Sequence, residues 1–186
     1  AAALVCGSLA GTANGAITLS DQGGGTYLAT IDPITMGITN SVSSVGFLVF
    51  EDFFDSNSTS SGAAINPTQM TISINGGPAQ NLTQSSSTGK INVSFSSFNT
   101  NDLFFDFNNA TSRKSLSSGD TVVIGGSFSF SGITDGVDSS ANEVTAYLVD
   151  GFSNVAGSTL VSVPEPSSSL LMALTGVFII GHRRRS

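Results

Sequence analysis

Apolar and polar side chains alternate at every second position along much of this sequence. The segment from Met70 to Ile74 alternates cleanly, and so do the segments from Ile91 to Phe95 and from Val144 to Leu148. Because successive side chains of a strand point to opposite faces, this period predicts strands with one buried and one solvent-facing side. The segment from Val45 to Phe50 is instead a continuous apolar run, which predicts a strand covered on both faces.

Turns that contain glycine divide these segments. Asn75-Gly76 follows an alternating segment and predicts a hairpin turn, with residues 79–83 as the returning strand. Gly23-Gly24-Gly25 predicts a second hairpin turn. Gly125-Gly126 lies within a strand-like segment and predicts a bulge or a sharp bend in a long strand. Residues 108–116 do not show the strand period, and we expect a turn or a short helix there.

Strands at spacings of roughly 10 to 15 residues predict an all-β fold, an antiparallel β-sandwich of the jelly-roll or Ig-like kind. We expect one domain from Ile17 to Ser162, which is long enough to bury a core without disulfides. An aromatic stripe can also line a sugar-binding surface, but such surfaces favour Trp and Tyr, and this chain has Trp 0 and Tyr 2. The phenylalanines expected in the core are Phe47, Phe50, Phe95, Phe104, Phe128 and Phe130.

The expected domain is acidic but carries few charges. Twelve of the 13 Asp and Glu residues lie within it, against Lys90, Arg113 and Lys114, so its net charge is near −9. Such a surface repels nucleic acid and anionic lipid, and we expect no nucleic-acid partner. Charged residues make up 10% of the chain, whereas Ser, Thr, Asn and Gly are abundant, so we expect a mostly neutral and polar surface.

The residue types that common catalysis needs are missing from the expected domain. The one His is His182 and the one Cys is Cys6, and both lie outside residues 17–162. This excludes Ser-His-Asp and Cys-His catalysis and ordinary zinc sites, so we expect a protein that is not an enzyme. A glycan hydrolase that uses two carboxylates is the alternative. Its candidate acids are Glu51, Asp52, Asp106 and Glu143, whose spacing selects no pair.

No cofactor is expected, with calcium as the one alternative. Asp135-Gly136-Val137-Asp138 is followed closely by Asn142 and Glu143, and hard cations need several oxygen ligands from one compact loop. The spacing does not match an EF-hand, and the same residue types are common in solvated turns. A turn without a metal therefore stands beside the calcium hypothesis. The candidate calcium ligands are Asp135, Asp138, Asn142 and Glu143.

The last residues of the chain form three zones of different chemistry. Val163-Pro164-Glu165-Pro166 comes first, and its prolines interrupt both strands and helices. An uncharged apolar segment follows, and Arg183, Arg184 and Arg185 come last. As a helix, residues 167–181 would rise about 22 Å, which spans a bilayer core of about 30 Å only with local thinning. The apolar residues of this predicted single transmembrane helix are Leu170, Leu171, Leu174, Val177, Phe178, Ile179 and Ile180.

Arginines beside a span stay in the cytoplasm, so the tail predicts that the domain lies on the outer side of the membrane. A buried C-terminal helix is the alternative, but such a helix would carry polar residues along one face. Val-Pro-Glu-Pro, a short apolar span and a terminal arginine cluster, in this order, resemble the PEP-CTERM sorting signal. The resemblance covers residues 163–186. It implies export, recognition of Pro164, Glu165 and Pro166 by a membrane protease called exosortase, and cleavage near this motif.

The first residues also indicate export. Residues 1–10 are apolar and small, and residues 11–16 are mostly small, as in the later part of a secretory signal peptide. We expect cleavage after Gly15 or Ala16. An ordinary apolar strand is the alternative. Lipid attachment to Cys6 is disfavoured, because Val5 rather than a small residue precedes it.

The sequence thus predicts a signal-peptide remnant over residues 1–16, a β-sandwich domain over residues 17–162 and a sorting signal over residues 163–186. The predicted function is that of an exported, non-catalytic protein of the cell surface or extracellular matrix. The expected route leads through the Sec system and a membrane-anchored intermediate. The resemblance adds exosortase, the inner membrane and exopolysaccharide as expected partners. A carbohydrate-binding module is the first alternative, and a carboxylate-based glycan hydrolase is the second.

Overall fold

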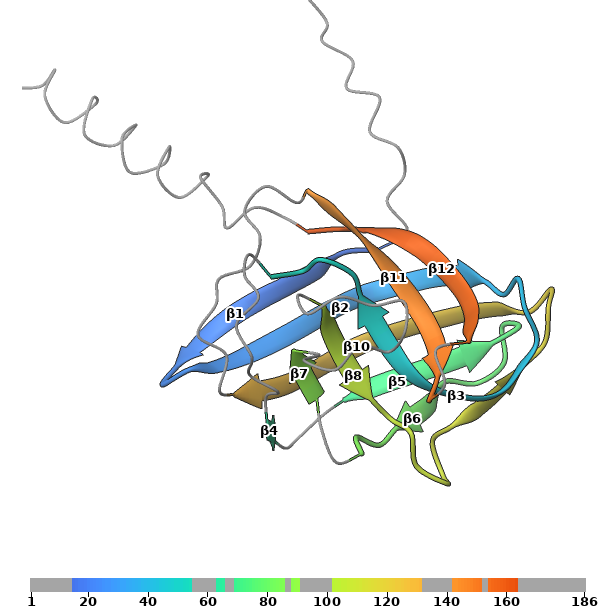
Figure 1. Cartoon of the computed structure of the whole chain (residues 1–186), viewed down its shortest axis with the longest axis horizontal. Coiled ribbons are helices and arrows are strands. Elements are labelled where there is room, and N and C mark those ends of the chain that lie inside the picture. The colour runs from blue at the N-terminus through green and yellow to red at the C-terminus, as the bar shows by residue number, and fades with distance from the viewer. Residues whose placement is uncertain are drawn as a thin grey trace, which may run out of the picture.

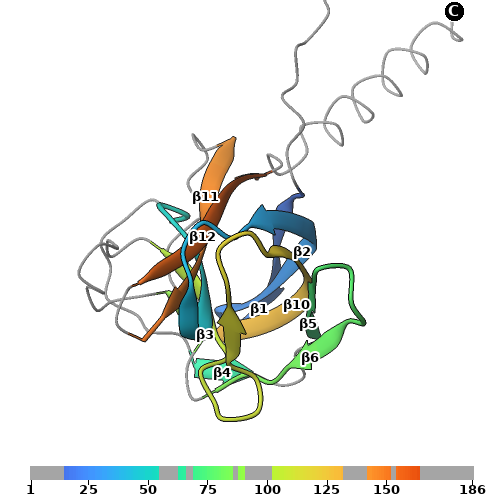
Figure 2. The same cartoon turned by 90° about the vertical axis from the view of Figure 1, so that its right-hand side faces the viewer.

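The computed structural model describes residues 15–54, 63–65, 69–85, 88–90, 102–131, 142–151 and 154–163. Within these ranges every regular element is a strand, and the strands form two antiparallel six-stranded sheets. The view in Figure 2 shows the two sheets as separate layers. The all-β prediction is therefore confirmed, and two facing antiparallel sheets are the arrangement of a β-sandwich.

Each sheet is named here after its central strand (Figure 1). The β10 sheet has the strand order β1-β2-β10-β5-β6, and β4 also pairs with β10. The β3 sheet has the order β12-β11-β3-β8-β7, and β9 also pairs with β3. The strands of the β10 sheet are β1 Ile17–Gly23, β2 Thr26–Gly37, β4 Ala63–Ile65, β5 Met70–Ile74, β6 Gln80–Leu82 and β10 Thr121–Ser131. Those of the β3 sheet are β3 Val42–Phe50, β7 Thr88–Lys90, β8 Leu103–Asp106, β9 Lys114–Leu116, β11 Glu143–Asp150 and β12 Val155–Ser162.

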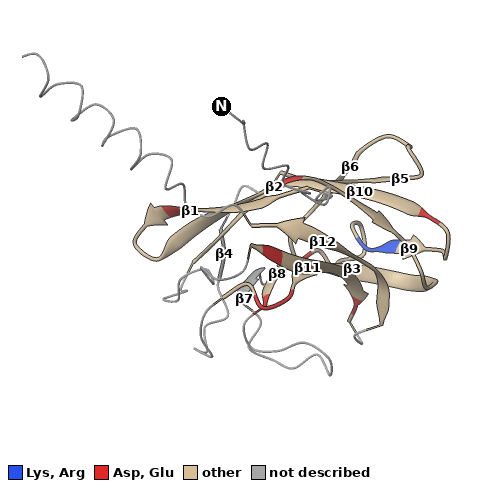
Figure 3. Ribbon diagram, turned by 90° about the horizontal axis from the view of Figure 1, so that it is seen from above, with Lys and Arg blue, Asp and Glu red and all other residues tan. Residues whose placement is uncertain are grey.

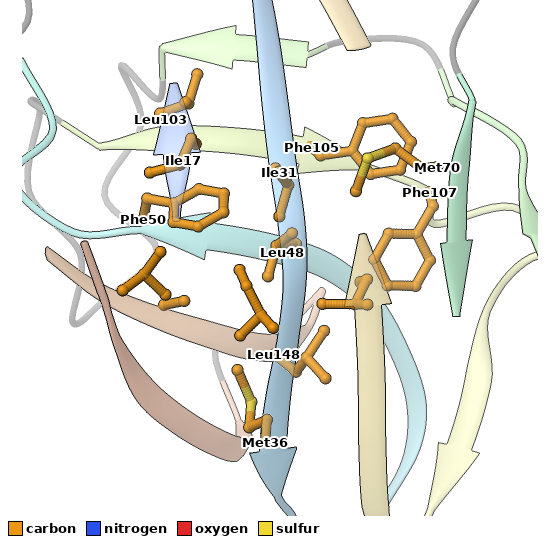
Figure 4. Packing of buried hydrophobic residues seen from close by; sticks show 14 of the residues in the cluster. Ile17, Ile31, Met36, Leu48, Phe50, Met70, Leu103, Phe105, Phe107 and Leu148 are labelled. Carbon is orange, nitrogen blue, oxygen red and sulfur yellow. The ribbon is translucent and has the colours of Figure 1, made fainter. Parts of the chain in front are cut away.

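Alternation places the apolar side chains of the strands between the sheets. In β2, Ile31 and Met36 are buried, whereas Thr30 and Thr35 are exposed. The buried pair belongs to one core cluster with residues of the facing sheet such as Leu48 (Figure 4). Removal of this apolar area from water, at about 25 cal/mol per Å², is the main force that holds the two sheets together.

The predicted core phenylalanines that the structure describes are all buried, namely Phe47, Phe50, Phe104, Phe128 and Phe130. Phe95, together with the strand predicted over residues 91–95, lies outside the described residues. The structure also buries almost completely further phenylalanines that the sequence pattern did not indicate as core residues, namely Phe53, Phe54, Phe105 and Phe107. Aromatic contacts between the sheets include Phe105 with Phe128, whose ring centroids are 5.1 Å apart.

The central strand β3 is buried on both faces, as its continuous apolar run predicted. Every residue from Val45 to Phe50 is buried. Some of these side chains enter the core between the sheets, and the others lie on the outer face of the β3 sheet. There they form a second cluster, called here the outer cluster. It consists of Phe47, Val49, Phe104 and Val149, with the half-buried Tyr147 and Val155 packed against it.

The predicted turns and the predicted bulge are confirmed. Residues 24–25 join β1 to β2, and Asn75 and Gly76 begin the turn from β5 to β6 with φ angles of 52° and 69°. The register of β2 against β10 shifts beside Gly126, within the predicted glycine pair. The extra residue of this bulge lies in β2 at Asp32-Pro33, where the missing N–H of proline costs no ladder bond.

Residues 108–116 contain turns and the short strand β9, so the alternative of a turn rather than a short helix is the one observed. The Asn109 side chain stabilises the turn, because its Oδ1 accepts hydrogen bonds from the backbone N–H groups of Thr111 and Ser112. Across the described ranges, no helix has the length and apolar character needed to cross a membrane.

The two sheets approach each other where β12 runs beside β2. The Thr39 backbone N–H donates to the Ala156 carbonyl at 2.9 Å. Ala16 forms a parallel bridge with Ser162, whose N–H donates to the Gly15 carbonyl at 3.2 Å. Gly15 and Ala16 therefore bond into the sandwich, although the sequence analysis assigned them to the signal peptide.

Candidate functional site

The outer face of the β10 sheet carries Ser and Thr at the positions that alternate with the core. Thr30, for example, lies between the buried Ala29 and Ile31, so its hydroxyl points away from the core. Leu28 and Val123 are half-buried apolar residues on the same side. This surface is called here the hydroxyl face, and it consists of Thr18, Ser20, Thr30, Thr35, Thr71, Ser73, Ser127 and Ser129.

Strand pairing aligns several of these hydroxyls across the sheet. Thr18 of β1 lies opposite Thr30 of β2, and Thr30 lies opposite Ser127 of β10. Neighbouring strands are about 4.8 Å apart, so the three side chains form a row across three strands. Thr71 and Ser73 extend the surface onto β5. The alternation that produces the face is visible in the sequence, but the row depends on strand pairing, which the sequence does not reveal.

The hydroxyl face is almost free of charge. In the described strands of this sheet, Asp21 and Asp32 are the charged residues, and there is no Lys or Arg among them. Figure 3 shows the same distribution, with mostly neutral ribbon over β2, β5 and β10. Because each hydroxyl both donates and accepts hydrogen bonds, this surface matches a neutral polar partner better than an ionic one.

An open recess of about 460 Å³ lies where the turn between β11 and β12 meets the start of β3. The buried Asp150 carboxylate accepts hydrogen bonds there from the backbone N–H and the side-chain amide of Asn154, at 2.9 and 2.8 Å. Asn40 Nδ2 donates to the Val155 carbonyl at 3.0 Å. These groups tie the turn to the start of β3, so the lining of the recess has a structural explanation.

Carboxylates and a tyrosine come together at one end of the outer cluster. The Tyr147 hydroxyl donates to Glu51 Oε2 at 2.8 Å, and the Asp52 backbone N–H donates to Asp102 Oδ1 at 2.9 Å. Burial raises the pKa of the Tyr147 hydroxyl, and the hydrogen bond to Glu51 and the charges of Glu51 and Asp102 raise it further. Asp102, which is fully buried, was not among the candidate acids, because nothing in its sequence neighbourhood distinguishes it.

The remaining candidate acids have separate surroundings. Asp106 is buried on β8 and accepts a hydrogen bond from the Asn108 backbone N–H at 2.8 Å. Asp52 is exposed and contributes its backbone N–H, rather than its carboxylate, to the contact with Asp102. The structure thus places Glu51 near Asp102, which was not among the candidate acids. It does not bring two of the candidate acids together as a catalytic pair for the hydrolase alternative.

Of the candidate calcium ligands, the structure describes Asn142 and Glu143. Asn142 is exposed, and its backbone carbonyl accepts a hydrogen bond from the Val163 N–H at 2.9 Å. Glu143 is exposed at the start of β11. Asp135 and Asp138 lie outside the described residues. Within the part of the chain that is described, no group of three or more Asp, Glu, His or Cys side chains could hold a metal ion, and calcium binding stays a prediction.

Val163 is the residue of the predicted sorting motif that the structure describes. It is 8% exposed, belongs to the core cluster and donates its N–H to Asn142. The first residue of the predicted motif thus packs as part of the folded domain. Pro164, Glu165 and Pro166, the predicted transmembrane residues and the three arginines lie outside the described ranges.

Comparison with known proteins reveals no relative of this chain. No protein-family model matches it, and no significant match was found among curated proteins or solved structures. The function is therefore inferred from the sequence and from the geometry above.

Proposed function

We propose that this protein is an exported, non-catalytic component of the cell surface or extracellular matrix that an exosortase sorting signal delivers. The observation that carries the proposal is the three-part tail over residues 163–186. In it the span from Leu170 to Ile180 is a transient transmembrane helix, and Arg183 to Arg185 remain in the cytoplasm. Exosortase and the inner membrane are then the partners of the unprocessed chain.

The boundary between sandwich and tail supports the proposal. Strand β12 ends at Ser162, and the buried Val163 directly precedes the Pro-Glu-Pro motif. Pro164 has no backbone N–H and cannot continue the ladder of a strand. A cut near Pro166 would therefore leave every described strand of the sandwich intact.

A jelly-roll or Ig-like connectivity is part of the same proposal. The consecutive strands β2 and β3 lie in different sheets, and so do β10 and β11. Strand β2 pairs with β10 in one sheet, while β3 pairs with β11 in the other. Such crossings between sheets are typical of Greek-key sandwiches, and many cell-surface domains have this architecture.

Mass spectrometry of the protein from its native cells tests the proposal. We expect protein on the cell surface or in the medium whose C-terminus lies near Pro166. A variant with Pro164→Ala, Glu165→Ala and Pro166→Ala should keep its tail and stay in the membrane. Glu143→Ala, which removes an exposed acid of the sandwich, should be processed normally. A mature surface protein that still ends at Ser186 would contradict the proposal.

Binding of a neutral polysaccharide is a second candidate function, which the hydroxyl face favours. Each hydrogen bond between neutral groups contributes only about 0.5–1.5 kcal/mol in net terms, because both partners leave water to form it. A polymer can engage several hydroxyls of the row at once, and linked weak contacts add to a useful avidity. Exopolysaccharide of low charge is the partner of this chemistry, since the acidic surface repels polyanions.

Retention on immobilised neutral exopolysaccharide tests this second function. The variant Thr18→Ala, Thr30→Ala, Ser127→Ala removes the row, and we expect it to lose most of the retention. The matched control removes exposed hydroxyls from the other sheet through Ser43→Ala, Ser115→Ala and Ser158→Ala, and should bind as the unchanged protein does. Equal retention of the two variants would exclude the hydroxyl face as the binding surface.

A further inference from the structure

Strand β1 forms one edge of the β10 sheet (Figure 1). Among the described residues it pairs with β2 alone, so no described strand extends the sheet on its other side. The strands β4, β6, β7 and β9 have 3 residues each, and the edge of β12 is bonded to other segments through Thr39 and Gly15. In the described part of the chain, β1 with its 7 residues is therefore the longest open edge of either sheet.

Hydrogen bonds at the start of β1 show which of its backbone groups face the open side. The Ala16 carbonyl accepts a hydrogen bond from the Asp32 N–H of β2 at 2.9 Å, whereas the Gly15 carbonyl accepts one from β12 at 3.2 Å. The N–H and C=O of a strand residue point to the same side, and that side alternates along the strand. The ladder to β2 is regular as far as Asp21. The backbone groups of Leu19 and Asp21 therefore point away from β2, to the open side.

Nothing in the sequence of β1 blocks this edge. Ala16 forms a parallel bridge with Ser162, so the end of β12 lies beside the start of β1, and the open part begins after it. There the N–H groups and carbonyls of Leu19 and Asp21 can bind a further strand. Natural proteins block such an edge with lysine, proline or a covering segment, and β1 contains neither lysine nor proline.

The side chains of β1 favour a neutral partner strand with the same alternation. Thr18 and Ser20 belong to the hydroxyl face, whereas Leu19 is half-buried and packs against the core cluster. Asp21 is the one charged residue of β1, and its carboxylate accepts a hydrogen bond from the Gly23 N–H at 2.7 Å. A partner strand with hydroxyls at every second position would continue the hydroxyl face without adding charge. The β1 strand of a second copy has this pattern.

We propose that two copies of this chain pair through their β1 strands, antiparallel and centred on Ser20. In this register Leu19 of each copy faces Asp21 of the other, and the open N–H and carbonyl groups of both residues are bonded. A register centred on Leu19 would place the second strand against Ile17, at the position that the end of β12 adjoins. A register centred on Asp21 would bring two like charges directly opposite each other, which is unfavourable. The open groups and the charge together thus select Ser20 as the centre.

The pairing would join the two β10 sheets into one continuous sheet. Such an isologous contact closes into a two-fold dimer, because each copy offers the same edge to the other. The hydroxyl faces of both copies then lie on one surface, and a polymer that crosses it can bind both copies at once, which raises avidity. The pairing itself needs neither export nor a polysaccharide, so its failure would leave both proposed functions untouched.

Disulfide formation between single cysteines tests the pairing and its register. The full chain is used with Cys6→Ser, in a mild detergent that keeps the apolar tail soluble. Under mild oxidation we expect Ser20→Cys to become mostly a disulfide-linked dimer, because the two Cα atoms of such a pair lie about 4.5 Å apart, within the range of a disulfide. Thr18→Cys, on the same face of the same strand, is the matched control. Its two Cα atoms would lie roughly 13 Å apart, so this variant should stay mostly monomeric.

Equal yields of dimer from the two cysteine variants, or no dimer from Ser20→Cys, would overturn the proposal. Analytical ultracentrifugation of the full chain tests it without a covalent link. Ser20→Lys places two like charges opposite each other and should lose the dimer, whereas Thr30→Lys, exposed on the next strand, should keep it. An unchanged chain that sediments as a monomer at every concentration would overturn the proposal, and so would equal dimer fractions of the two lysine variants.

Discussion

The two sheets share one core but differ in their outer faces. The outer face of the β10 sheet presents the exposed or half-buried Ser and Thr side chains of the hydroxyl face. The outer face of the β3 sheet carries the outer cluster, in which Val49 and Val149 are 0% exposed. The β10 sheet therefore ends in solvent, whereas the β3 sheet is withdrawn from solvent on both sides at the outer cluster, although its edge strand β12 still exposes Ser158 and Leu160.

This difference follows from the spacing of apolar residues in the strands. Strand β5 alternates from Met70 to Ile74, and only the face toward the core is apolar. Strand β3 is apolar from Val45 to Phe50, so both of its faces have to be covered. The comparison also locates the candidate interaction surface, because a partner can reach the hydroxyl face directly, whereas the outer cluster is already buried.

The largest expected effect tests whether both faces of the β3 sheet are buried. Phe104 and Phe105 are neighbours in β8 and belong to the outer cluster and the core cluster, respectively. We expect Phe104→Ala and Phe105→Ala each to lower the free energy of unfolding by about 3–5 kcal/mol, measured by urea denaturation.

Substitutions at two neighbouring residues of β5, in the β10 sheet, should instead differ strongly in their effect on stability. Ile72→Ala removes a core side chain and should cost about 2–5 kcal/mol, whereas Thr71→Ala on the hydroxyl face should change stability by less than about 0.5 kcal/mol. If Phe104→Ala were as mild as Thr71→Ala, the two outer faces would not differ as described.

Substitution of Gly126, which lies opposite the bulge of β2, should have the next largest effect on stability. Gly126 has φ 119°, and a Cβ there would collide with the Gln69 backbone carbonyl oxygen. Gly126→Ala should therefore destabilise the protein by about 1–3 kcal/mol in thermal or urea unfolding. Gly37→Ala, at an open position of β2, is the control. Equal stability of the two variants would contradict the close approach of β10 to the start of β5.

Introducing one hydroxyl on each outer face should distinguish the two faces through smaller changes in stability. Val49→Thr puts an unpaired polar group into the outer cluster and should cost about 1–3 kcal/mol. Val123→Thr adds one more hydroxyl to a half-buried position of the hydroxyl face and should change stability by less than about 0.5 kcal/mol. Urea midpoints of the two variants give the comparison, and it fails if Val123→Thr is the more destabilising change.

The smallest expected effects concern pH. Because the pKa of Tyr147 is raised in the folded protein, its contribution to stability is present below the unfolded pKa of about 10 and is lost as the pH rises through the folded pKa. Tyr147→Phe should flatten the fall in melting temperature above about pH 10. If the melting temperature of this variant fell above about pH 10 as steeply as that of the unchanged protein, ionisation of Tyr147 beside the outer cluster would not be what destabilises the fold.

At the β10 sheet the sign is opposite. The Ser117 N–H and the Asn75 amide donate to the Asp120 carboxylate and lower its pKa. Its contribution is present above the unfolded pKa of about 3.9 and is lost as the pH falls through the folded pKa. Asp120→Asn should therefore reduce the fall in melting temperature at acidic pH. Asp21→Asn, at an exposed position, is the control.

Much of the fold could be predicted from local patterns in the sequence. Alternation in Met70–Ile74, the continuous apolar run of β3 and the glycines of the turns act through neighbouring residues, so the sequence displays them. The segment from Leu103 to Phe107 shows the limit. One of its faces is apolar throughout and enters the core with Phe105 and Phe107, whereas the other carries Phe104 beside Asp106, so the pattern does not show that Phe104 is buried in an outer cluster.

The candidate site was harder to predict, because it depends on contacts between distant residues. The row through Thr18, Thr30 and Ser127 requires the pairing of β2 with β10, about a hundred residues apart. The same holds for Gly15, whose role appears only when Ser162 lies beside it. Gly15, one of the small residues that suggested a cleavage site in the sequence, also permits a close approach of the backbone to Pro33 and Ile34 of β2.

The central claim, that the hydroxyl face is open to solvent while the outer cluster is buried, can be tested by the rate of thiol labelling in the native state. Thr30→Cys and Val49→Cys are compared in protein that lacks Cys6. The account predicts that Cys at position 30 reacts as fast as in denaturant. Cys at position 49 should react at least about 100-fold more slowly, because the structure has to open locally before the buried thiol becomes accessible. Equal labelling rates at the two positions would contradict the account.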